Sequence, residues 1–203
     1  MNFLSIESAT NSPSVALYSS GLCIDSCFLK KNSSELPSKV KEIISNNNFE
    51  INNLDCIAIT IGPGSYTGIR VGLSLAQGLA YSLNIPLIPV NTMDILYSIA
   101  FSGNNIDRIV GFPAYNGKLL HCVTSTSIEN ETYELELSDI NLFNGKTIYG
   151  VGLSRYKDII NYKKIKFSAK SIGKYSIDNY ESLCCKDIGS IAPIYLDEFL
   201  ISQ

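Results

Sequence analysis

The chain has 203 residues, of which 45% are hydrophobic and 17% are charged, and its formal net charge is −3 at pH 7. This composition excludes a disordered chain, and no apolar run reaches the ~18 residues that a membrane span needs. The length allows one domain or two small lobes with a substantial core. The negative net charge argues against a general polyanion-binding protein.

The first residues and the cysteines indicate an intracellular protein. Residues 1–7 lack a basic segment and reach a carboxylate before the apolar core of a signal peptide could form. The six cysteines show neither C-x-x-C pairs nor the spacing of a disulfide framework. We therefore expect a cytoplasmic protein with free thiols and no membrane attachment.

The start of the chain has the spacing of an α/β protein. Residues 3–7 and 14–18 have the composition of two antiparallel strands joined by a turn, and residues 22–29 alternate like a third strand. Apolar residues recur at helical spacing in 36–45, and Asn46-Asn47-Asn48 ends that helix. We expect an antiparallel meander followed by a helix.

Residues 57–83 are the most informative stretch. A β-branched run at 57–61 stops at Gly62-Pro63-Gly64 and the spacing then becomes helical, which predicts a strand, a glycine turn and a helix. The free N–H groups of the first helical turn could hold an anion, although the loop is neither a Walker A loop nor a dinucleotide-binding loop. Alternatively, the glycines only permit a tight turn and close packing of the helix on the sheet. The candidate phosphate loop consists of Gly62, Gly64, Ser65, Thr67, Gly68 and Arg70.

The helix within this stretch is apolar over an unusually wide arc. Its polar residues, Arg70, Ser74, Gln77 and Tyr81, share one narrow strip, and apolar or small residues fill the remaining arc of roughly 220°. A helix that covers one sheet needs an apolar stripe of only ~100° or somewhat more. The helix is therefore predicted to meet a second body, which is either another chain or a neighbouring helix of the same domain.

The remainder of the chain completes one lobe and builds a second. Residues 85–90 fit a strand and 91–101 a helix, which closes a first lobe at residues 1–102. Asn116-Gly117 is typical of a hairpin turn. The second lobe is assigned to residues 103–203, after a boundary at 102–105, with strands at 109–112, 118–126, 132–137, 147–151 and 165–168, helices near 155–162 and within 171–186, and a tail at 191–203 that docks on the first lobe.

The chain offers few groups for catalysis. His121 is the only histidine, so a multi-histidine metal site and a serine nucleophile with its own histidine base both lack support. It lies in an alternating segment, which favours a histidine on a sheet face. Glu7 could bind Mg²⁺ or could cap the turn after the first strand. We predict no catalytic residue and no metal site.

A basic segment follows in the second half of the chain. Residues 155–174 carry seven basic residues against one aspartate. A solvated lysine-rich face explains such a segment, and an RNA contact is the alternative. No aromatic-interleaved recognition motif accompanies it in the sequence. We expect it to add at most weakly, and in a salt-dependent way, to RNA binding by the isolated chain.

Several segments of the sequence together carry a family resemblance. They are Ile6-Glu-Ser-Ala-Thr10, Ser14-Val-Ala-Leu-Tyr18, Gly62-Pro-Gly-Ser-Tyr-Thr-Gly-Ile-Arg-Val-Gly72, Ala76-Gln-Gly-Leu-Ala80, Gly150-Val-Gly152 and Pro193-Ile-Tyr-Leu196. Through them the sequence resembles the TsaB (YeaZ) family over residues 3–95, and the form of the glycine motif is specific to that family. In the second lobe the similarity is weaker.

The resemblance implies an α/β fold related to actin, sugar kinases and Hsp70, with two lobes of which the second is reduced. It implies a non-catalytic scaffold that binds TsaD, the catalytic paralogue, and with TsaE helps to place threonylcarbamoyl on the tRNA adenosine next to the anticodon. It implies no cofactor in the isolated chain, ATP or ADP only in the complex, and tRNA contact only through the complex. Alone, the chain is expected to form a homodimer through the surface that binds TsaD.

The resemblance and the wide apolar arc agree on where this surface lies. Two neighbouring helices, at 36–45 and 67–83, would each contribute an apolar stripe, and small residues would let a partner backbone approach closely. The interface residues are predicted to be Val40, Ile43, Ile44, Val71, Gly72, Leu75, Ala76 and Leu79.

The sequence also departs from the family pattern. Glu7-Ser8 stands where the family has Asp-Thr, Pro113-Ala114-Tyr115 where it has Asp-Ala-Arg, and Asp197 where an arginine is common. The first two changes remove or move polar groups that a nucleotide site would use. The alternative functions are an ATP-dependent phosphotransferase or ATPase of the same superfold, which needs that site, and a metallopeptidase, which needs a metal.

Overall fold

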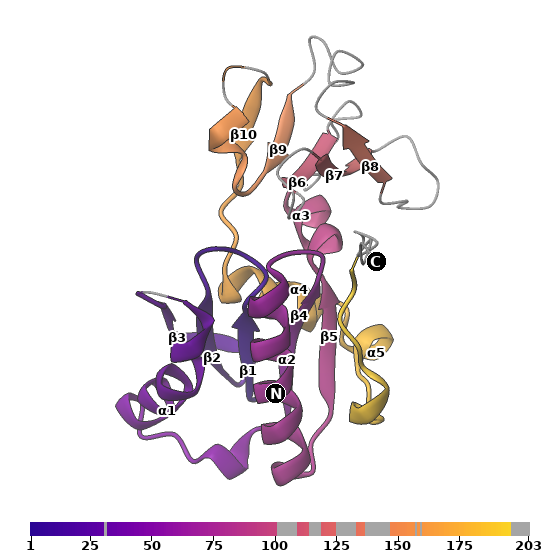
Figure 1. The fold of residues 1–203 in the computed structure, drawn as a ribbon. Helices are drawn as coiled ribbons and strands as arrows, with labels where there is room; N and C mark the ends of the chain where they lie inside the picture. Colours follow the sequence, from indigo (N-terminus) through magenta and orange to yellow (C-terminus); the bar gives the residue numbers. More distant parts are fainter. Residues whose placement is uncertain are drawn as a thin grey trace, which may run out of the picture.

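The structure is a computed structural model that describes residues 1–30, 32–100, 109–113, 119–124, 133–136, 147–156, 158 and 160–195. Its strands form two five-stranded sheets, which Figure 1 shows as two lobes, one above the other. Within these residues, no helix is long and apolar enough to cross a membrane.

The first sheet contains the meander that the sequence predicted. In space its strands follow the order β3-β2-β1-β4-β5. The first three strands pair antiparallel, whereas β4 and β5 run parallel to β1. The edge position of β5 accommodates Pro89, since an edge strand can lose a backbone donor. The strands are β1 (Phe3–Glu7), β2 (Ser14–Ser19), β3 (Leu22–Phe28), β4 (Cys56–Gly62) and β5 (Leu87–Asn91).

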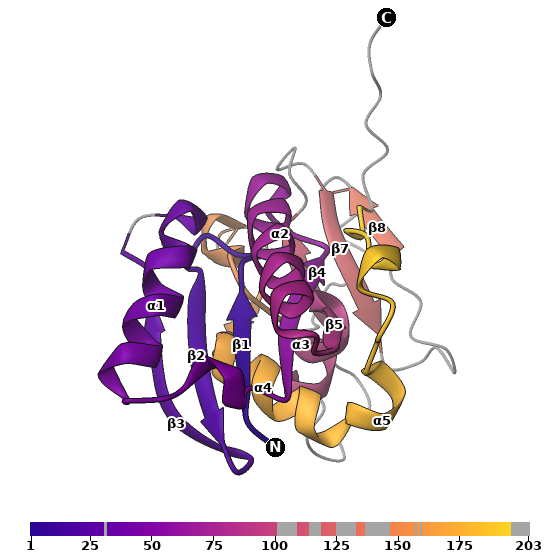
Figure 2. The same cartoon turned by 90° about the horizontal axis from the view of Figure 1, so that it is seen from below.

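Helices cover both faces of this sheet because its strands are apolar on both sides. α1 (Leu36–Asn46) and α2 (Tyr66–Leu83) share a core with one set of alternate strand residues. α3 (Thr92–Ala100) and α4 (Ala169–Asp178) share a core with the other set. Figure 2 shows α2 and α4 on opposite sides of the strands. The first lobe is therefore a three-layered α/β/α unit.

α4 lies on the first sheet, although the sequence analysis assigned its residues to the second lobe. The Ser5 hydroxyl donates to the Ala169 carbonyl at 2.7 Å, and the Ala169 N–H donates to Ser14 Oγ at 2.9 Å. The Tyr18 hydroxyl donates to the Lys170 carbonyl at 2.9 Å. These contacts join residues more than 150 positions apart, which local sequence patterns do not reveal.

The second sheet carries the predicted hairpin. Its strands follow the order β10-β9-β6-β7-β8, and β6 pairs antiparallel with β7. The predicted turn at Asn116-Gly117 and the predicted boundary at 102–105 lie outside the described residues. The strands are β6 (Ile109–Pro113), β7 (Leu119–Thr124), β8 (Tyr133–Glu136), β9 (Ile148–Gly150) and β10 (Tyr162–Lys164).

Three predictions for residues 153–186 were wrong in detail. The expected strand at 165–168 is a connection that keeps one hydrogen bond to a strand, from the Ile165 N–H to the Gly150 carbonyl at 2.8 Å. Ile165 and Phe167 alternate because both are buried in the core beside α4. The expected helix at 155–162 is a 3₁₀ turn at Leu153–Tyr156 followed by β10. The helix expected within 171–186 is divided into α4 and α5 (Tyr180–Leu183), with a break at Asn179.

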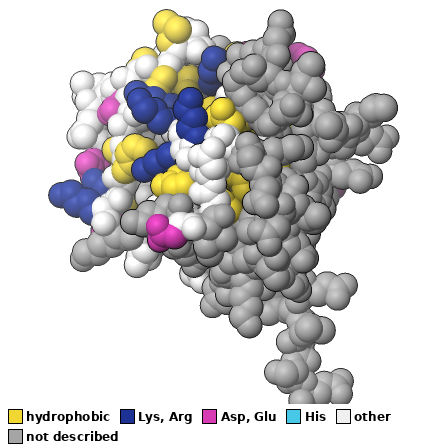
Figure 3. All heavy atoms as spheres, turned by 90° about the horizontal axis from the view of Figure 1, so that it is seen from above, with side chains coloured by type: hydrophobic (Ala, Val, Ile, Leu, Met, Phe, Trp, Pro, Cys, Tyr) yellow, Lys and Arg dark blue, Asp and Glu magenta, His cyan; other side chains and the backbone are white. Residues whose placement is uncertain are grey.

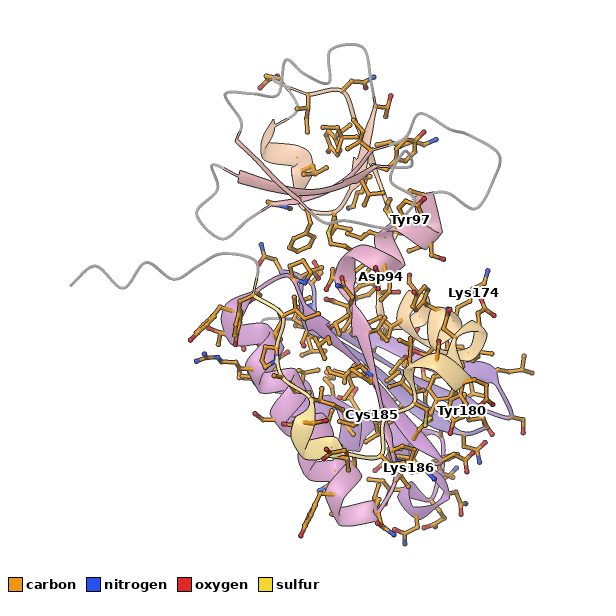
Figure 4. The ribbon with its side chains drawn as sticks, turned by 90° about the vertical axis from the view of Figure 1, so that its right-hand side faces the viewer. Asp94, Tyr97, Lys174, Tyr180, Cys185 and Lys186 are labelled. Carbon is orange, nitrogen blue, oxygen red and sulfur yellow. The ribbon has the colours of Figure 1, made fainter. Side chains whose placement is uncertain are left out.

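The segment after α5 forms a strap along the first lobe, which we define as residues 185–195. Cys185 exchanges two backbone hydrogen bonds with Leu87, at 2.8 and 3.0 Å, and so covers the outer edge of β5 (Figure 4). The Gln77 amide donates to the carbonyls of Ile188 and Ile191, both at 3.0 Å. The Ile194 N–H donates to the Ile61 carbonyl at 2.7 Å. The apolar tail thus lies on the first lobe as far as the structure describes it.

The small residues of α2 bring this helix close to its own sheet. A Cβ atom on Gly68 would collide with the Ser8 carbonyl, and one on Gly72 would collide with the Ser8 hydroxyl. Ala76 is fully buried. Gly78 lies on the opposite side of the helix, and a Cβ atom there would meet no atom within 4 Å.

We predict opposite effects on the free energy of unfolding for alanine at Gly72 and at Gly78. Gly72→Ala should destabilise the fold by about 1–3 kcal/mol, because the added methyl group overpacks the contact with Ser8. Gly78→Ala should be neutral or stabilise it by up to about 1 kcal/mol, because alanine favours the helix and space is free. Urea denaturation of both variants measures the difference. Equal effects would contradict the orientation of α2.

Candidate functional site

A cavity of about 570 Å³ lies between the two lobes. The turn after β1 and the glycine turn after β4 form its wall on the first lobe. The ends of β6, β9 and β10 form the other wall. Among the described residues that line it, Lys164 carries the only charged side chain, and none is a carboxylate. The lining residues are Ala9, Thr10, Asn11, Ser12, Gly64, Ser65, Phe112, Pro113, Val151, Gly152, Leu153, Ser154, Tyr162 and Lys164.

The glycine turn is packed against its own chain. The Ser65 N–H donates to the Ala9 carbonyl at 2.7 Å, and a Cβ atom on Gly64 would collide with that same carbonyl. Gly62 has φ +116° and comes so close to the Ile194 carbonyl that a Cβ atom would not fit. Ser65 Oγ accepts from the Gly68 N–H at 3.2 Å and caps α2. These contacts favour the structural interpretation of the glycines over phosphate binding.

Arg70 does not belong to the cavity. Its Nε donates to the Tyr195 hydroxyl at 2.7 Å, and its guanidinium carbon lies 3.8 Å from the centre of the Tyr66 ring. The centres of the Tyr66 and Tyr195 rings lie 5.2 Å apart. Arg70 therefore fastens the end of the strap to the first turns of α2. Of the six residues of the candidate phosphate loop, two line the cavity, Gly64 and Ser65.

Glu7 holds the turn after β1. The side chain is fully buried, and its two oxygens accept from the N–H and the hydroxyl of Thr10, each at 2.8 Å. Burial raises the pKa of this carboxyl to about 7, and the hydrogen bonds from Thr10 oppose the shift. Glu7 thus matches the turn-capping alternative. The described residues contain no cluster of acidic, cysteine or histidine side chains that could hold a metal.

The metal-nucleotide chemistry of the superfold does not fit these residues. Such a site needs carboxylates that can reach a cation between the lobes, directly or through water. Glu7 instead points at Thr10, and the described lining offers no carboxylate. Pro113 ends β6 and lines the cavity, whereas Ala114, Tyr115 and Asp197 lie outside the described residues.

Half of the predicted interface residues are in the chain's own core. Val40 and Ile43 are 4% and 2% exposed, and Gly72 and Ala76 face β1 and β4. Their assignment to a partner surface was wrong, because the helical spacing gives the width of an apolar arc but not the direction in which it faces. The other four, which are half-buried at the outer edge of that core, are Ile44, Val71, Leu75 and Leu79.

His121 and the cysteines add no second site. His121 lies on β7, opposite Phe112 of β6 and Glu134 of β8 in the strand register, as expected for a sheet position. The cysteines whose side chains are described are all free thiols. Burial raises the pKa of the Cys56 thiol to about 12, which makes it a poor nucleophile.

Glu7 should make stability depend on pH. Its pKa is near 4.5 in the unfolded chain and about 7 in the folded one, so the folded state binds the proton more tightly between these values. Stability is then lost as the pH rises from about 4.5 to 7, by on the order of 3 kcal/mol at most. Glu7→Gln should remove this slope in urea denaturation between pH 5 and 8. The exposed Glu50→Gln should leave it in place, and an equal slope in all three proteins would contradict the buried position of Glu7.

Comparison with known proteins finds sequence similarity to TsaD and TsaB proteins over about half of the chain. The family model of TsaD, tRNA N6-adenosine threonylcarbamoyltransferase, matches residues 28–115. The tRNA threonylcarbamoyladenosine biosynthesis protein TsaB of Haemophilus influenzae is 30% identical over 112 residues, which are 54% of this chain and 48% of that protein. TsaB of Escherichia coli K12 is 32% identical over 113 residues, with the same two shares. The chain thus spans about half the length of the curated relatives it matches.

Solved structures extend the likeness to the whole fold. A Pseudomonas aeruginosa protein described as similar to peptidase YEAZ superposes with a TM-score of 0.76 at 18% identity, over 97% of this chain and 99% of that one. YeaZ from the same organism gives 0.74 at 17% identity, over 96% and 100%. The expected two-lobed α/β fold of the actin, sugar-kinase and Hsp70 type is confirmed. The chain is thus similar to TsaB proteins in sequence over about half of its length, and to YeaZ structures in fold over nearly all of it.

Proposed function

We propose that the chain is a non-catalytic partner of TsaD in the synthesis of tRNA threonylcarbamoyladenosine. The names of its relatives support this role. The interlobe cavity agrees with it, because its described lining lacks the carboxylates of a phosphotransferase. The observation that carries the proposal is the open outer side of α2, where apolar side chains flank a glycine with free space above it.

This outer side has the properties of a helix-packing surface. Val71, Leu75 and Leu79 are half-buried beside the first-lobe core, and Ile44 continues the stripe onto α1. Gly78 costs the isolated helix up to about 1 kcal/mol relative to alanine. That cost is offset if a second helix packs directly over the missing side chain. We define the outer α1–α2 surface as these five residues.

The same surface explains the two expected assemblies. Two copies related by a two-fold axis would bring identical surfaces together and form a four-helix contact. TsaD would occupy that surface in the heterodimer, so homodimer and heterodimer would exclude each other. TsaE and ATP or ADP would act only in the larger complex, in the cytoplasm, and stable tRNA binding would need that complex.

A charge on the outer surface should prevent both assemblies. Gly78→Glu places a carboxylate in space that is free in the single chain, so the fold should survive while a partner would have to bury an unpaired charge. We expect loss of TsaD in a pull-down and a monomer in light scattering. Ile177→Glu is the matched control, because Ile177 is 37% exposed on α4, which packs on the other face of the sheet.

Circular dichroism of both variants shows whether they fold. A folded Gly78→Glu protein that binds TsaD like the wild type would overturn the proposed surface. Equal loss of binding in both variants would also overturn it, because the effect would then follow charge alone.

The isolated chain should neither bind nor hydrolyse ATP at micromolar concentrations. Calorimetry with ATP and Mg²⁺ should show no binding heat, because the described cavity lining lacks a carboxylate. Micromolar binding with turnover by this chain alone would favour the phosphotransferase alternative. A stoichiometric transition metal in the purified protein would favour the metallopeptidase.

A further inference from the structure

Five exposed lysines follow one another from β10 to α4. They are Lys163, Lys164, Lys166, Lys170 and Lys174. No aspartate or glutamate occurs in residues 159–177. Within the described part of the chain, the ion pair found joins Lys39 and Glu42, so these five lysines carry charge without a carboxylate partner. Figure 4 shows Lys174 projecting from α4 into solvent.

The structure adds aromatic rings to these lysines. The Lys163 ammonium lies 5.8 Å from the centre of the half-exposed Tyr149 ring, on the neighbouring strand β9. Figure 3 shows Lys and Arg side chains close to apolar ones on the described part of this end of the molecule. In the sequence, the absence of such rings was the reason to favour a merely solvated face.

A third feature of the α4 side of the molecule is Phe28, an exposed residue of the first lobe. It is 57% exposed and pairs with Ser14 across the β2–β3 ladder. Directly paired residues point to the same face of a sheet. Ser14 Oγ accepts from the Ala169 N–H on that face, so the ring of Phe28 lies on the side where the chain arrives from Lys166. Phe28, 138 positions before Lys166 in the chain, thus supplies an exposed ring on the face of the first sheet that α4 covers.

Protection of a strand edge against pairing with other chains explains some of these lysines. β10 is an outer strand of its sheet, and lysines on such strands discourage pairing with other chains. That role explains Lys163 and Lys164. It does not explain Lys166, Lys170 and Lys174, which lie beyond the strand, nor a phenylalanine that is more than half exposed.

We define the basic surface as Lys163, Lys166, Lys170 and Lys174 together with the rings of Phe28 and Tyr149. We propose that this surface binds single-stranded nucleic acid, with the lysines contacting phosphates and the two rings stacking on bases. Basic tracks with interspersed rings bind single strands in this way. The surface lies on the α4 side of the first sheet, whereas the outer α1–α2 surface lies on the other side. The chain could therefore hold a protein partner and an RNA strand together. The inference goes beyond the proposed function and does not depend on it.

The affinity should be low and sensitive to salt. Lys164 lines the cavity instead, since it points to the other face of β10 from Lys163. If the other four lysines met phosphates of a single strand, the logarithm of the binding constant would fall with the logarithm of the salt concentration with a slope of about −2.8. Binding would weaken about fiftyfold between 50 and 200 mM salt. This weak contact agrees with the expectation that stable tRNA binding needs the complex.

Fluorescence anisotropy tests the lysines. The full chain is titrated into a labelled 12-nucleotide oligouridylate, and into the corresponding DNA strand, at 50 mM salt. Lys163→Gln with Lys166→Gln should weaken binding by about tenfold or more and reduce the salt slope by about 1.4. Lys41→Gln with Lys186→Gln removes the same charge from exposed lysines elsewhere and should change binding less than twofold. Figure 4 shows Lys186 well apart from Lys174.

A second pair of variants tests the rings. Phe28→Ala should weaken binding about five- to a hundredfold, the range for loss of one stacked base. Leu22→Ala is its control, because Leu22 is 72% exposed at the other end of β3. Binding of RNA alone, or of RNA and DNA alike, would support the proposal.

Three outcomes would overturn it: no binding by the wild type at 50 mM salt, equal losses in the two lysine pairs, or no effect of Phe28→Ala together with full competition by polyglutamate. The last would indicate a surface for acidic proteins. Thermal melting shows that each variant is folded, and the salt slope of the wild type tests the proposal without any variant. TsaD pull-down stays a separate readout, so failure here leaves the proposed function untouched.

Discussion

The contact between α2 and the turn after β1 determines most of what this chain can do. Three glycines of the motif permit this close approach, since side chains at Gly64 and Gly68 would collide with the carbonyls of Ala9 and Ser8, and one at Gly72 with the Ser8 side chain. The contact fixes the position of α2 on the sheet and leaves the far side of the helix, at Gly78, free of its own chain.

The first lobe was largely predictable because its signals are local. Alternation located β1 to β3, helical spacing located α1 and α2, and the glycine turn located the end of β4. The family motifs lie in these same segments, which is why sequence and fold agree best there.

Directions and distant neighbours were not predictable. Helical spacing collected Gly72 and Gly78 into one arc, but only the sheet decides that Gly72 points inward and Gly78 outward. The alternation of Ile165 and Phe167 looked like a strand because burial beside a helix produces the same pattern. The cavity between the lobes, and the placing of Phe28 on the face of the first sheet that α4 covers, arise from long-range packing, which local sequence patterns do not reveal.

The strap and α4 also bear on the order in which the chain can fold. The sheet of the first lobe consists of strands from residues 3–91. One of its faces stays partly uncovered until α4 packs on it, and the outer edge of β5 stays unpaired until Cys185 binds there. The second sheet therefore lies within the first lobe as an insertion. During synthesis the ribosome must deliver nearly all of the described chain before the first lobe is closed. Contacts this far apart in sequence slow folding, and they leave an apolar sheet face and a strand edge open to other chains in the interval.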